Sequence, residues 1–341
     1  MSTPAGAFDC SQTTKLSRPI DLGVSGGNIN SFLNHNKVCF SGTLGSMVQD
    51  PGGTRFILSN NHVIADINKA KPGELIVQPG LADTQPACTK TPGDAVATFT
   101  RAVHINFGGG TNKVDAAIAA VLPNDVSPNI LNIGPIASTV VSPTLGLGVQ
   151  KMGRSTCLTT GSISAVGAKG KINYGKGQNA KFVNLILINV QDFSTPGDSG
   201  SLIVTQGACP QAVGLLFAGA ANHSQTIANP ISDVLSKLGV SMTGGCPMAA
   251  TAAPQVVDQA GNAAISKDLV DSATAVRDRH EDELMKIPGA VGTAIGISDT
   301  PGQPAIEVYV KKMTPEAEAA APKDVDGVPV KLIENGGFVA Y

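Results

Sequence analysis

Ten short β-favouring runs, separated by Gly, Pro, Asn and Asp, follow one another between residues 38 and 245. Gly (39) and Pro (22) together supply about 18% of the 341 residues, against a usual share of about 12%. Strands that recur every 10–20 residues or so, with turn signals between them, are typical of all-β sandwiches and barrels. The runs are CFSGTLGSMV, RFILSNNHVI, ELIVQPG, AVATFTRAV, VDAAIAAVL, LGVQKMG, GSISAV, FVNLILINV, SGSLIV and AVGLLFAG.

A segment rich in Pro, Asn and Ser, residues 123–143, divides these runs five and five. We interpret it as a connector and expect one β-barrel at about 37–122 and a second at about 144–245, within a domain spanning 37–245. The preceding residues 1–36 have no helical period and contain a Gly-rich patch. They predict a polar N-terminal arm.

The texture of the sequence changes after the second predicted barrel. Residues 246–261 form a linker of mostly small residues, and 266–286 carry apolar positions at helical spacing with Ser266 as the N-cap. The sequence therefore predicts a small α/β domain at 262–341. Beyond the helix we expect strands in AVGTAIGIS and AIEVYVKK, a short helix in TPEAEAAAP and a final strand or hairpin in VPVKLIENGGFVAY.

Charge and hydropathy exclude two classes of partner. The 24 basic and 26 acidic residues nearly cancel and form no block of like charge, which argues against a nucleic-acid or polybasic membrane surface. No run of about 18 apolar residues predicts a membrane span. The first twenty residues lack the basic start and apolar stretch of a secretory signal, so a cytoplasmic location is favoured over a secreted one.

The six cysteines are scattered, without a C-x-x-C pair or a histidine at zinc-binding spacing. We therefore expect neither a metal nor a cofactor. Six cysteines allow 15 pairings, and the sequence selects none of them.

Three residues have the types that nucleophilic catalysis requires. His62 follows the apolar run RFIL, Asp115 opens the strand VDAAIAAV, and Ser199 lies in the tight turn TPGDSGS. A serine hydroxyl attacks well only when an imidazole takes its proton, and a buried carboxylate orients that imidazole. The chain order His, Asp, Ser and the lack of a G-x-S-x-G pattern argue against an α/β-hydrolase.

Five segments in this order resemble the chymotrypsin/trypsin superfamily of serine peptidases. GDSGS resembles its GDSGG nucleophile loop, SNNHVI its A-A-H-C motif, and VDAAIA its D-I-A-L strand. MGRSTCLTTGSISAV is similar to the S-G-R-T-T…G-T-I segment of bacterial secreted members, and VGLLFAG to the strand that pairs with the substrate backbone. The resemblance covers residues 38–245 and implies a chymotrypsin-like all-β double barrel, here followed by the small α/β domain.

The resemblance also implies roles for residues near the serine. The amides of Gly197 and Ser199 would form the oxyanion hole. Asp198 would be held by a salt bridge, and Arg154 occupies the position of the arginine that makes this bridge in the bacterial branch. An Arg154–Asp198 pair would thus lock the loop without an activating cleavage.

The substrate pocket that the resemblance implies is lined by Phe193, Phe217, Ala218 and Gly219. Phe193 stands six residues before the serine, where an acidic residue would attract Lys or Arg, and it predicts an apolar pocket. We expect this pocket to favour apolar residues at P1, the position before the cleaved bond. His223, near the substrate strand, is a loop residue or a pocket contact.

The sequence thus predicts a serine endopeptidase that acts on protein or peptide substrates through an acyl-enzyme. Two alternatives stay open at this point. One is a catalytically weak or inactive protease-like binding or regulatory protein, and the other is a self-processing protease with one dedicated partner. The C-terminal domain could contact the peptidase domain as an inhibitor or a folding aid, or recruit a partner.

Overall fold

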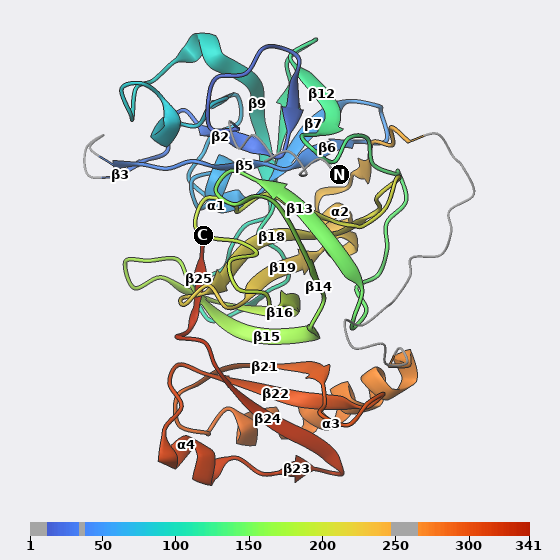
Figure 1. Ribbon diagram of the computed structural model, residues 1–341. Coiled ribbons are helices and arrows are strands. Elements are labelled where there is room, and N and C mark those ends of the chain that lie inside the picture. The colour runs from blue at the N-terminus through green and yellow to red at the C-terminus, as the bar shows by residue number, and fades with distance from the viewer. Residues whose placement is uncertain (1–11, 34–37, 247–264) are drawn as a thin grey trace, which may run out of the picture.

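A computed structural model describes residues 12–33, 38–246 and 265–341. Two curled β-sheets lie one above the other, and a small α/β unit follows below them (Figure 1). The predicted fold class, an all-β double barrel followed by a small α/β domain, is confirmed. The predicted linker and the first eleven residues of the predicted arm lie mostly or wholly outside the described residues.

The first barrel is an eight-stranded sheet in the order β20-β6-β7-β11-β9-β8-β2-β5. Successive residues of its strands face opposite sides, so one core includes Leu44, Ile57 and Ile76. Apolar side chains of the other face, such as Leu58, belong to a core that also contains Leu202 of the second barrel. The strands of the first barrel are β2 (Val24–Asn28), β5 (Gly42–Leu44), β6 (Ser46–Gln49), β7 (Arg55–Ser59), β8 (Leu75–Val77), β9 (Ala95–Ala102), β11 (Ala117–Val121) and β20 (Ser241–Met242).

The polar arm predicted for residues 1–36 is wrong in part, because β2 belongs to this barrel. It pairs with β5 and β8 in antiparallel fashion. A Cβ atom on Gly26 would lie 2.4 Å from Cγ of Leu44. The Gly-rich patch therefore permits a close backbone approach inside a sheet.

The second barrel is centred on β18, whose nine residues are all buried. A run this apolar on both faces packs against two cores, one containing Phe217 and the other Leu216. The strands are β10 (Thr111–Asn112), β13 (Gly148–Gly153), β14 (Cys157–Ser162), β15 (Ala165–Asn173), β16 (Asn179–Ile188), β17 (Leu202–Thr205), β18 (Ala212–Ala220) and β19 (Thr226–Pro230).

Short elements connect or close the barrels. The helix α2 (Ile231–Leu238) ends at Gly239, whose φ of 62° suits a residue without a side chain. The others are β1 (Ile20–Leu22), β3 (Phe32–Leu33), β4 (Val38–Cys39), α1 (Asn61–Ile64), the 3₁₀ turns η1 (Leu81–Asp83) and η2 (Pro92–Asp94), and β12 (Val126–Ile130).

The C-terminal unit is built on the long helix α3 (Lys267–Leu284), which begins as predicted: the hydroxyl of Ser266 accepts a hydrogen bond from the amide of Leu269. Its apolar face packs on a sheet that the pairing of β21 with β15 joins to the second barrel. The other elements are β21 (Ala290–Ile297), β22 (Pro304–Val310), α4 (Pro315–Ala320), β23 (Asp324–Val325), β24 (Val328–Glu334) and β25 (Phe338–Ala340).

The hairpin considered for the last fourteen residues does not form. β24 runs parallel to β22 inside the C-terminal unit. β25 instead leaves that unit and pairs with β15 and β18 of the second barrel (Figure 1). Residues Phe338–Ala340 therefore lie against the second barrel.

Side chains also join the C-terminal unit to the second barrel. Arg277 is 1% exposed and donates a hydrogen bond of 3.0 Å to the carbonyl of Gly167. Lys169 lies 2.8 Å from a carboxylate oxygen of Asp278. The two units are thus held together by one continuous sheet and by a buried arginine.

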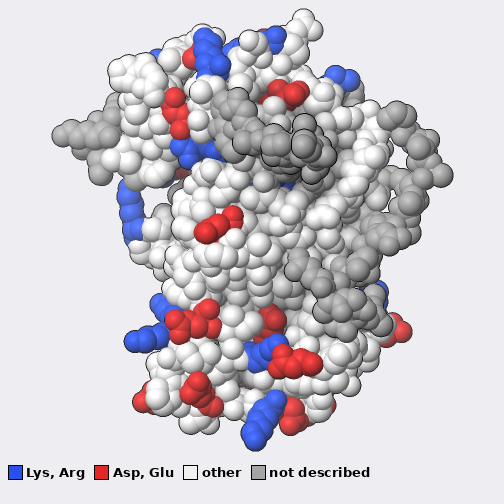
Figure 2. All heavy atoms as spheres, in the orientation of Figure 1, with Lys and Arg blue, Asp and Glu red and all other residues white. Residues whose placement is uncertain are grey.

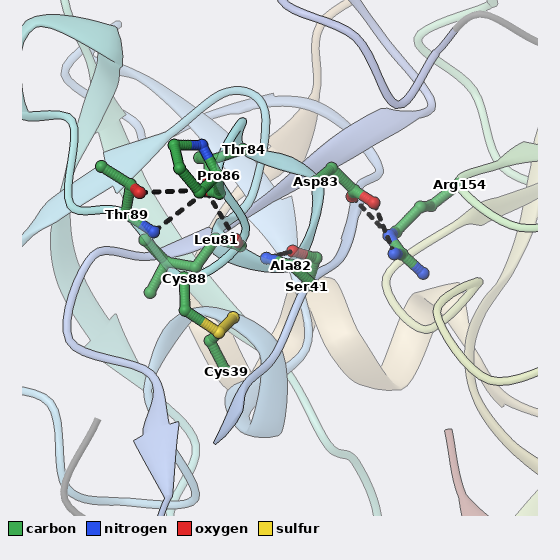
Figure 3. Close-up of a disulfide and its surroundings, with 10 residues drawn as sticks. All are labelled: Cys39, Ser41, Leu81, Ala82, Asp83, Thr84, Pro86, Cys88, Thr89 and Arg154. Atoms are coloured by element: carbon green, nitrogen blue, oxygen red, sulfur yellow. Dashed lines mark hydrogen bonds and ion pairs between the residues drawn. A yellow bond between two sulfur atoms is a disulfide. The ribbon is translucent and has the colours of Figure 1, made fainter. Parts of the chain in front are cut away.

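Two disulfides lie in the described part of the chain, Cys39–Cys88 in the first barrel (Figure 3) and Cys209–Cys246 in the second. No helix among the described residues is long and apolar enough to span a membrane. On the face shown in Figure 2, acidic and basic side chains are interspersed, without a broad area of one sign.

Candidate active site

His62 and Asp115 meet because their strands are neighbours in the first barrel. β7 ends at Ser59 and leads into α1, which carries His62, and β11 pairs with β7 and begins two residues after Asp115. The Nδ1 atom of His62 lies 2.6 Å from Oδ2 of Asp115, and the His62 amide donates to Oδ1 at 3.3 Å. The carboxylate therefore fixes both the ring and the main chain of the histidine.

Asp115 is fully buried and has a second donor that the sequence did not predict. The hydroxyl of Tyr174 donates to Oδ2 at 2.8 Å. Burial and the neighbouring carboxylate raise the pKa of Tyr174 well above its usual value, so this hydroxyl keeps its proton. Only the folded chain brings Tyr174, from the turn after β15, to this carboxylate.

The environment of His62 favours its protonated form. Burial lowers the pKa of His62, but the Asp115 carboxylate and a main-chain oxygen of Tyr341 outweigh burial and raise it above its usual value. That oxygen lies 2.8 Å from Nε2. Each ring nitrogen therefore has an oxygen within hydrogen-bond distance, an arrangement that stabilises the protonated ring.

Ser199 lies in a tight loop of the second barrel. The amide of Asp198 donates to the carbonyl of Thr195, and that of Ser201 to the carbonyl of Asp198. Gly200 has a φ of 96°, and a Cβ atom there would lie 2.1 Å from the Thr43 carbonyl oxygen. Only glycine fits at this position, which explains the G-D-S-G pattern in physical terms.

The hydroxyl of Ser199 donates to the carbonyl of Phe217 at 3.1 Å. In the part of the chain that the structure describes, no hydrogen bond joins Ser199 to His62. Within the same part, the amides of Gly197 and Ser199 donate to no other residue. These two donors are therefore free for the oxygen of a bound group.

The predicted Arg154–Asp198 lock is wrong. Arg154 instead forms a two-pronged pair with Asp83, with distances of 2.7 and 2.6 Å (Figure 3). Arg154 follows the last residue of β13 and turns outward to η1. Asp198 faces Gly153, where a Cβ atom would lie 2.5 Å from its Oδ1 atom.

The cation that faces Asp198 is Lys151, which points inward from β13. Its Nζ atom is 3.7 Å from Oδ1 of Asp198, and both side chains are fully buried. Asp198 also accepts hydrogen bonds from Thr156 and from the amides of Ser155 and Thr195. Burial lowers the pKa of Lys151 to about 8, although Asp198 opposes this shift.

The four predicted pocket residues contribute in different ways. Phe193 packs in the core cluster that Tyr341 joins, and a Cβ atom on Gly219 would lie 2.0 Å from the Tyr341 hydroxyl. The ring of Phe217 packs on Phe182 in another cluster. The main chains of Phe217 and Ala218 pair with residues Ala340 and Tyr341.

The residues that the structure describes contain no group of three or more His, Cys, Asp or Glu side chains arranged to hold a metal ion.

Comparisons with known proteins give one family and several solved structures. The family described as the Nal1 C-terminal domain matches residues 125–230. No curated protein sequence matches the chain.

Among solved structures, a glutamic-acid-specific serine protease with a histidine triad in substrate binding is similar at 17% identity. It covers 66% of this chain and 100% of its own, with a TM-score of 0.45. Nocardiopsis protease (NAPase) is 18% identical, covering 65% and 99%, with a TM-score of 0.44. Thermobifida fusca Protease A is 17% identical, covering 66% and 99%, with a TM-score of 0.43.

Proposed function

We propose that the protein is a serine endopeptidase that hydrolyses peptide bonds through an acyl-enzyme at Ser199. The observation that carries this proposal is the buried Asp115–His62 pair, with a 2.6 Å hydrogen bond. A carboxylate in this position holds the imidazole in one orientation and stabilises the imidazolium that forms during catalysis.

The proposed reaction moves one proton back and forth. Ser199 attacks the peptide carbonyl carbon as His62 Nε2 takes the hydroxyl proton. His62 then gives this proton to the departing amine, and the C–N bond breaks. Water repeats the sequence on the ester and releases the acid, which restores the Ser199 hydroxyl. The amides of Gly197 and Ser199 would bind the developing oxyanion, each contributing on the order of 10²–10³ in rate.

One observation favours the alternative of an inactive, protease-like binding protein. The Ser199 hydroxyl donates to Phe217 rather than to His62. The Nε2 atom of His62 lies 2.8 Å from a main-chain oxygen of Tyr341 instead. The experiment below decides between the two functions.

The test is covalent labelling of the full chain with a fluorophosphonate probe, read by mass spectrometry. We expect one adduct, on Ser199, because such probes form a covalent bond with an activated serine. Ser199→Ala should abolish labelling, whereas the matched control Ser201→Ala should retain it, because the Ser201 hydroxyl only donates to the carbonyl of Asp198. Equal, slow labelling of all three proteins would favour the binding function.

A further inference from the structure

We infer that the binding site along β18, beside Ser199 and His62, is built for polypeptides with tyrosine at P1. Phe338–Tyr341 occupies this site, called the cleft below, as a resident, substrate-like strand. The C-terminal domain would thus carry its own competitive inhibitor. This inference rests on the proposed peptidase function and adds a substrate class to it.

The main chain of this segment runs along β18 as an added antiparallel strand. Ala340 is opposite Ala218, Val339 opposite Gly219, and Phe338 opposite Ala220. An extended peptide added to a sheet edge gains its affinity from such main-chain pairing, and side-chain pockets give specificity. Pairing of this kind does not depend on the identity of Val339 or Ala340, so other sequences could bind in the same way.

The segment ends at the candidate catalytic groups. The amide of Tyr341 donates at 3.3 Å to the carbonyl of Phe217, which also accepts from the Ser199 hydroxyl. A main-chain oxygen of the same tyrosine lies 2.8 Å from Nε2 of His62. Tyr341 is therefore the residue that lies between the serine and the histidine, where the P1 residue of a substrate would bind.

The Tyr341 side chain packs against the second barrel and has a polar contact at its far end. Its hydroxyl donates to the carbonyl of Ala220 at 3.2 Å. The ring of His223 meets the tyrosine ring edge-on, with centroids 6.0 Å apart. Gly219 leaves the space that the ring needs.

These contacts predict how strongly the site distinguishes P1 residues. The Ala220 carbonyl also accepts from the amide of His223. Loss of the tyrosine hydroxyl therefore does not leave this carbonyl unpaired, and phenylalanine should lose only about 3–10-fold. Alanine should lose on the order of 100-fold or more, because it leaves the space of the aromatic ring unfilled.

Because the segment belongs to the same chain as the site, a short strand can compete with substrates. Phe338 packs edge-on against Tyr309 with centroids 5.4 Å apart, and it pairs with Ile172 of β15. The Ala221 amide also donates to the carbonyl of Gly337 at 2.9 Å. A segment anchored at its base in this way has a high effective concentration at the cleft.

The experiment compares the full chain with Tyr341→Ala on the peptides Phe-Val-Ala-X-reporter, where X is Tyr, Phe, Ala or Lys. We expect kcat/KM for X = Tyr to rise at least tenfold in Tyr341→Ala. The matched control Tyr341→Phe should stay within severalfold of the full chain. Tyrosine should exceed phenylalanine by about 3–10-fold, and both should exceed alanine and lysine by at least 100-fold.

A second measurement avoids dependence on the folding of one variant. The free peptide Phe-Val-Ala-Tyr should inhibit the Tyr341→Ala and Tyr341→Asp proteins competitively, at least tenfold better than Phe-Val-Ala-Ala. Unchanged activity in folded Tyr341→Ala, or equal rates for alanine or lysine at P1, would overturn this inference. Fluorophosphonate labelling of Ser199 in Tyr341→Ala would then still support the peptidase, whereas its absence from every variant would overturn the proposed function as well.

Discussion

Asp115 and Asp198 are both fully buried carboxylates of the candidate site, but the structure neutralises them in different ways. Asp115 faces His62, a histidine, the residue type whose charge changes near neutral pH, and accepts one hydrogen bond from the neutral hydroxyl of Tyr174. Asp198 faces Lys151 and takes hydrogen bonds from the main chain of its own loop and of the β13–β14 turn.

A buried carboxylate can serve two different roles, depending on its partner. A carboxylate paired with an imidazole can stabilise a charge that appears and disappears during a reaction. A carboxylate paired with a buried lysine and with fixed amides instead holds a loop in one shape. In the proposed mechanism, Asp115 would stabilise the charge on His62, and Asp198 would hold the Ser199 loop.

The largest effect should come from Asp115→Asn. The amide is similar in size, but it removes the charge that stabilises the imidazolium, so kcat/KM should fall by on the order of 10⁴. Peptide hydrolysis and thermal unfolding should be measured on the same preparation. If kcat/KM falls by this amount because Asp115→Asn unfolds, the account is contradicted, because Asp115 would then act on stability as Asp198 does.

Lys151→Met should destabilise the protein by about 3–5 kcal/mol, because it leaves the Asp198 carboxylate buried without its cation. Denaturant unfolding measures this loss, and activity should fall with it as the loop loosens. The matched variant Arg154→Met lies three residues away and removes the two hydrogen bonds to Asp83 and one to Ser155. It should cost less than Lys151→Met, because Asp83 keeps a hydrogen bond from the Ser25 hydroxyl. A larger effect of Arg154→Met would reverse the assignment of the loop cation.

The pH dependence of Ser199 labelling should report the contact between His62 and the resident segment. The pKa of His62 is raised by Asp115 and Tyr341, so stabilisation of the resident segment is fully present below the usual value of about 6.5. It is lost as pH rises through the raised pKa. The ratio of labelling rates, Tyr341→Ala over full chain, should therefore shrink with rising pH. A ratio that grows with pH would contradict the imidazolium contact.

The smallest effect should come from Tyr174→Phe, which removes one hydrogen bond from Asp115 and leaves the ring packing. We expect a loss in kcat/KM of about 3–10-fold. Without this donor the Asp115 carboxylate stabilises protonated His62 more strongly. The acid limb of the pH–rate profile, which reports protonation of His62, should therefore move to higher pH. An unshifted profile would mean that the hydroxyl does not act on the Asp115–His62 pair.

Local sequence signals predicted the elements that depend on local interactions. Ser266 and the apolar spacing after it predicted a helix at 266–286, and the structure has α3 at Lys267–Leu284. His62, Asp115 and Ser199 were predicted from motifs at strand ends and in a glycine-bounded turn, and the structure brings His62 and Asp115 into contact. Steric requirements as strict as those at Gly200 leave a pattern in the sequence.

Contacts between distant segments left no such signal. Lys151 was missed because a lysine within a strand is usually solvated, and its burial follows from the inward register of β13. The route of β25 was missed because VPVKLIENGGFVAY fits a hairpin locally, whereas pairing with β18 joins residues far apart in the chain. Tyr174 reaches Asp115 across 59 positions.

Histidine nitrogen NMR of the full chain tests most directly the claim that His62 is the acid–base group of this site, held by Asp115 and facing the cleft. We predict that both ring nitrogens of His62 carry protons at pH 6.5, with a strongly downfield Nδ1 proton that disappears in Asp115→Asn. In Tyr341→Ala, Nε2 should lose its proton at a lower pH than in the full chain. A His62 ring that is neutral at pH 6.5 and unaffected by either substitution would contradict the account.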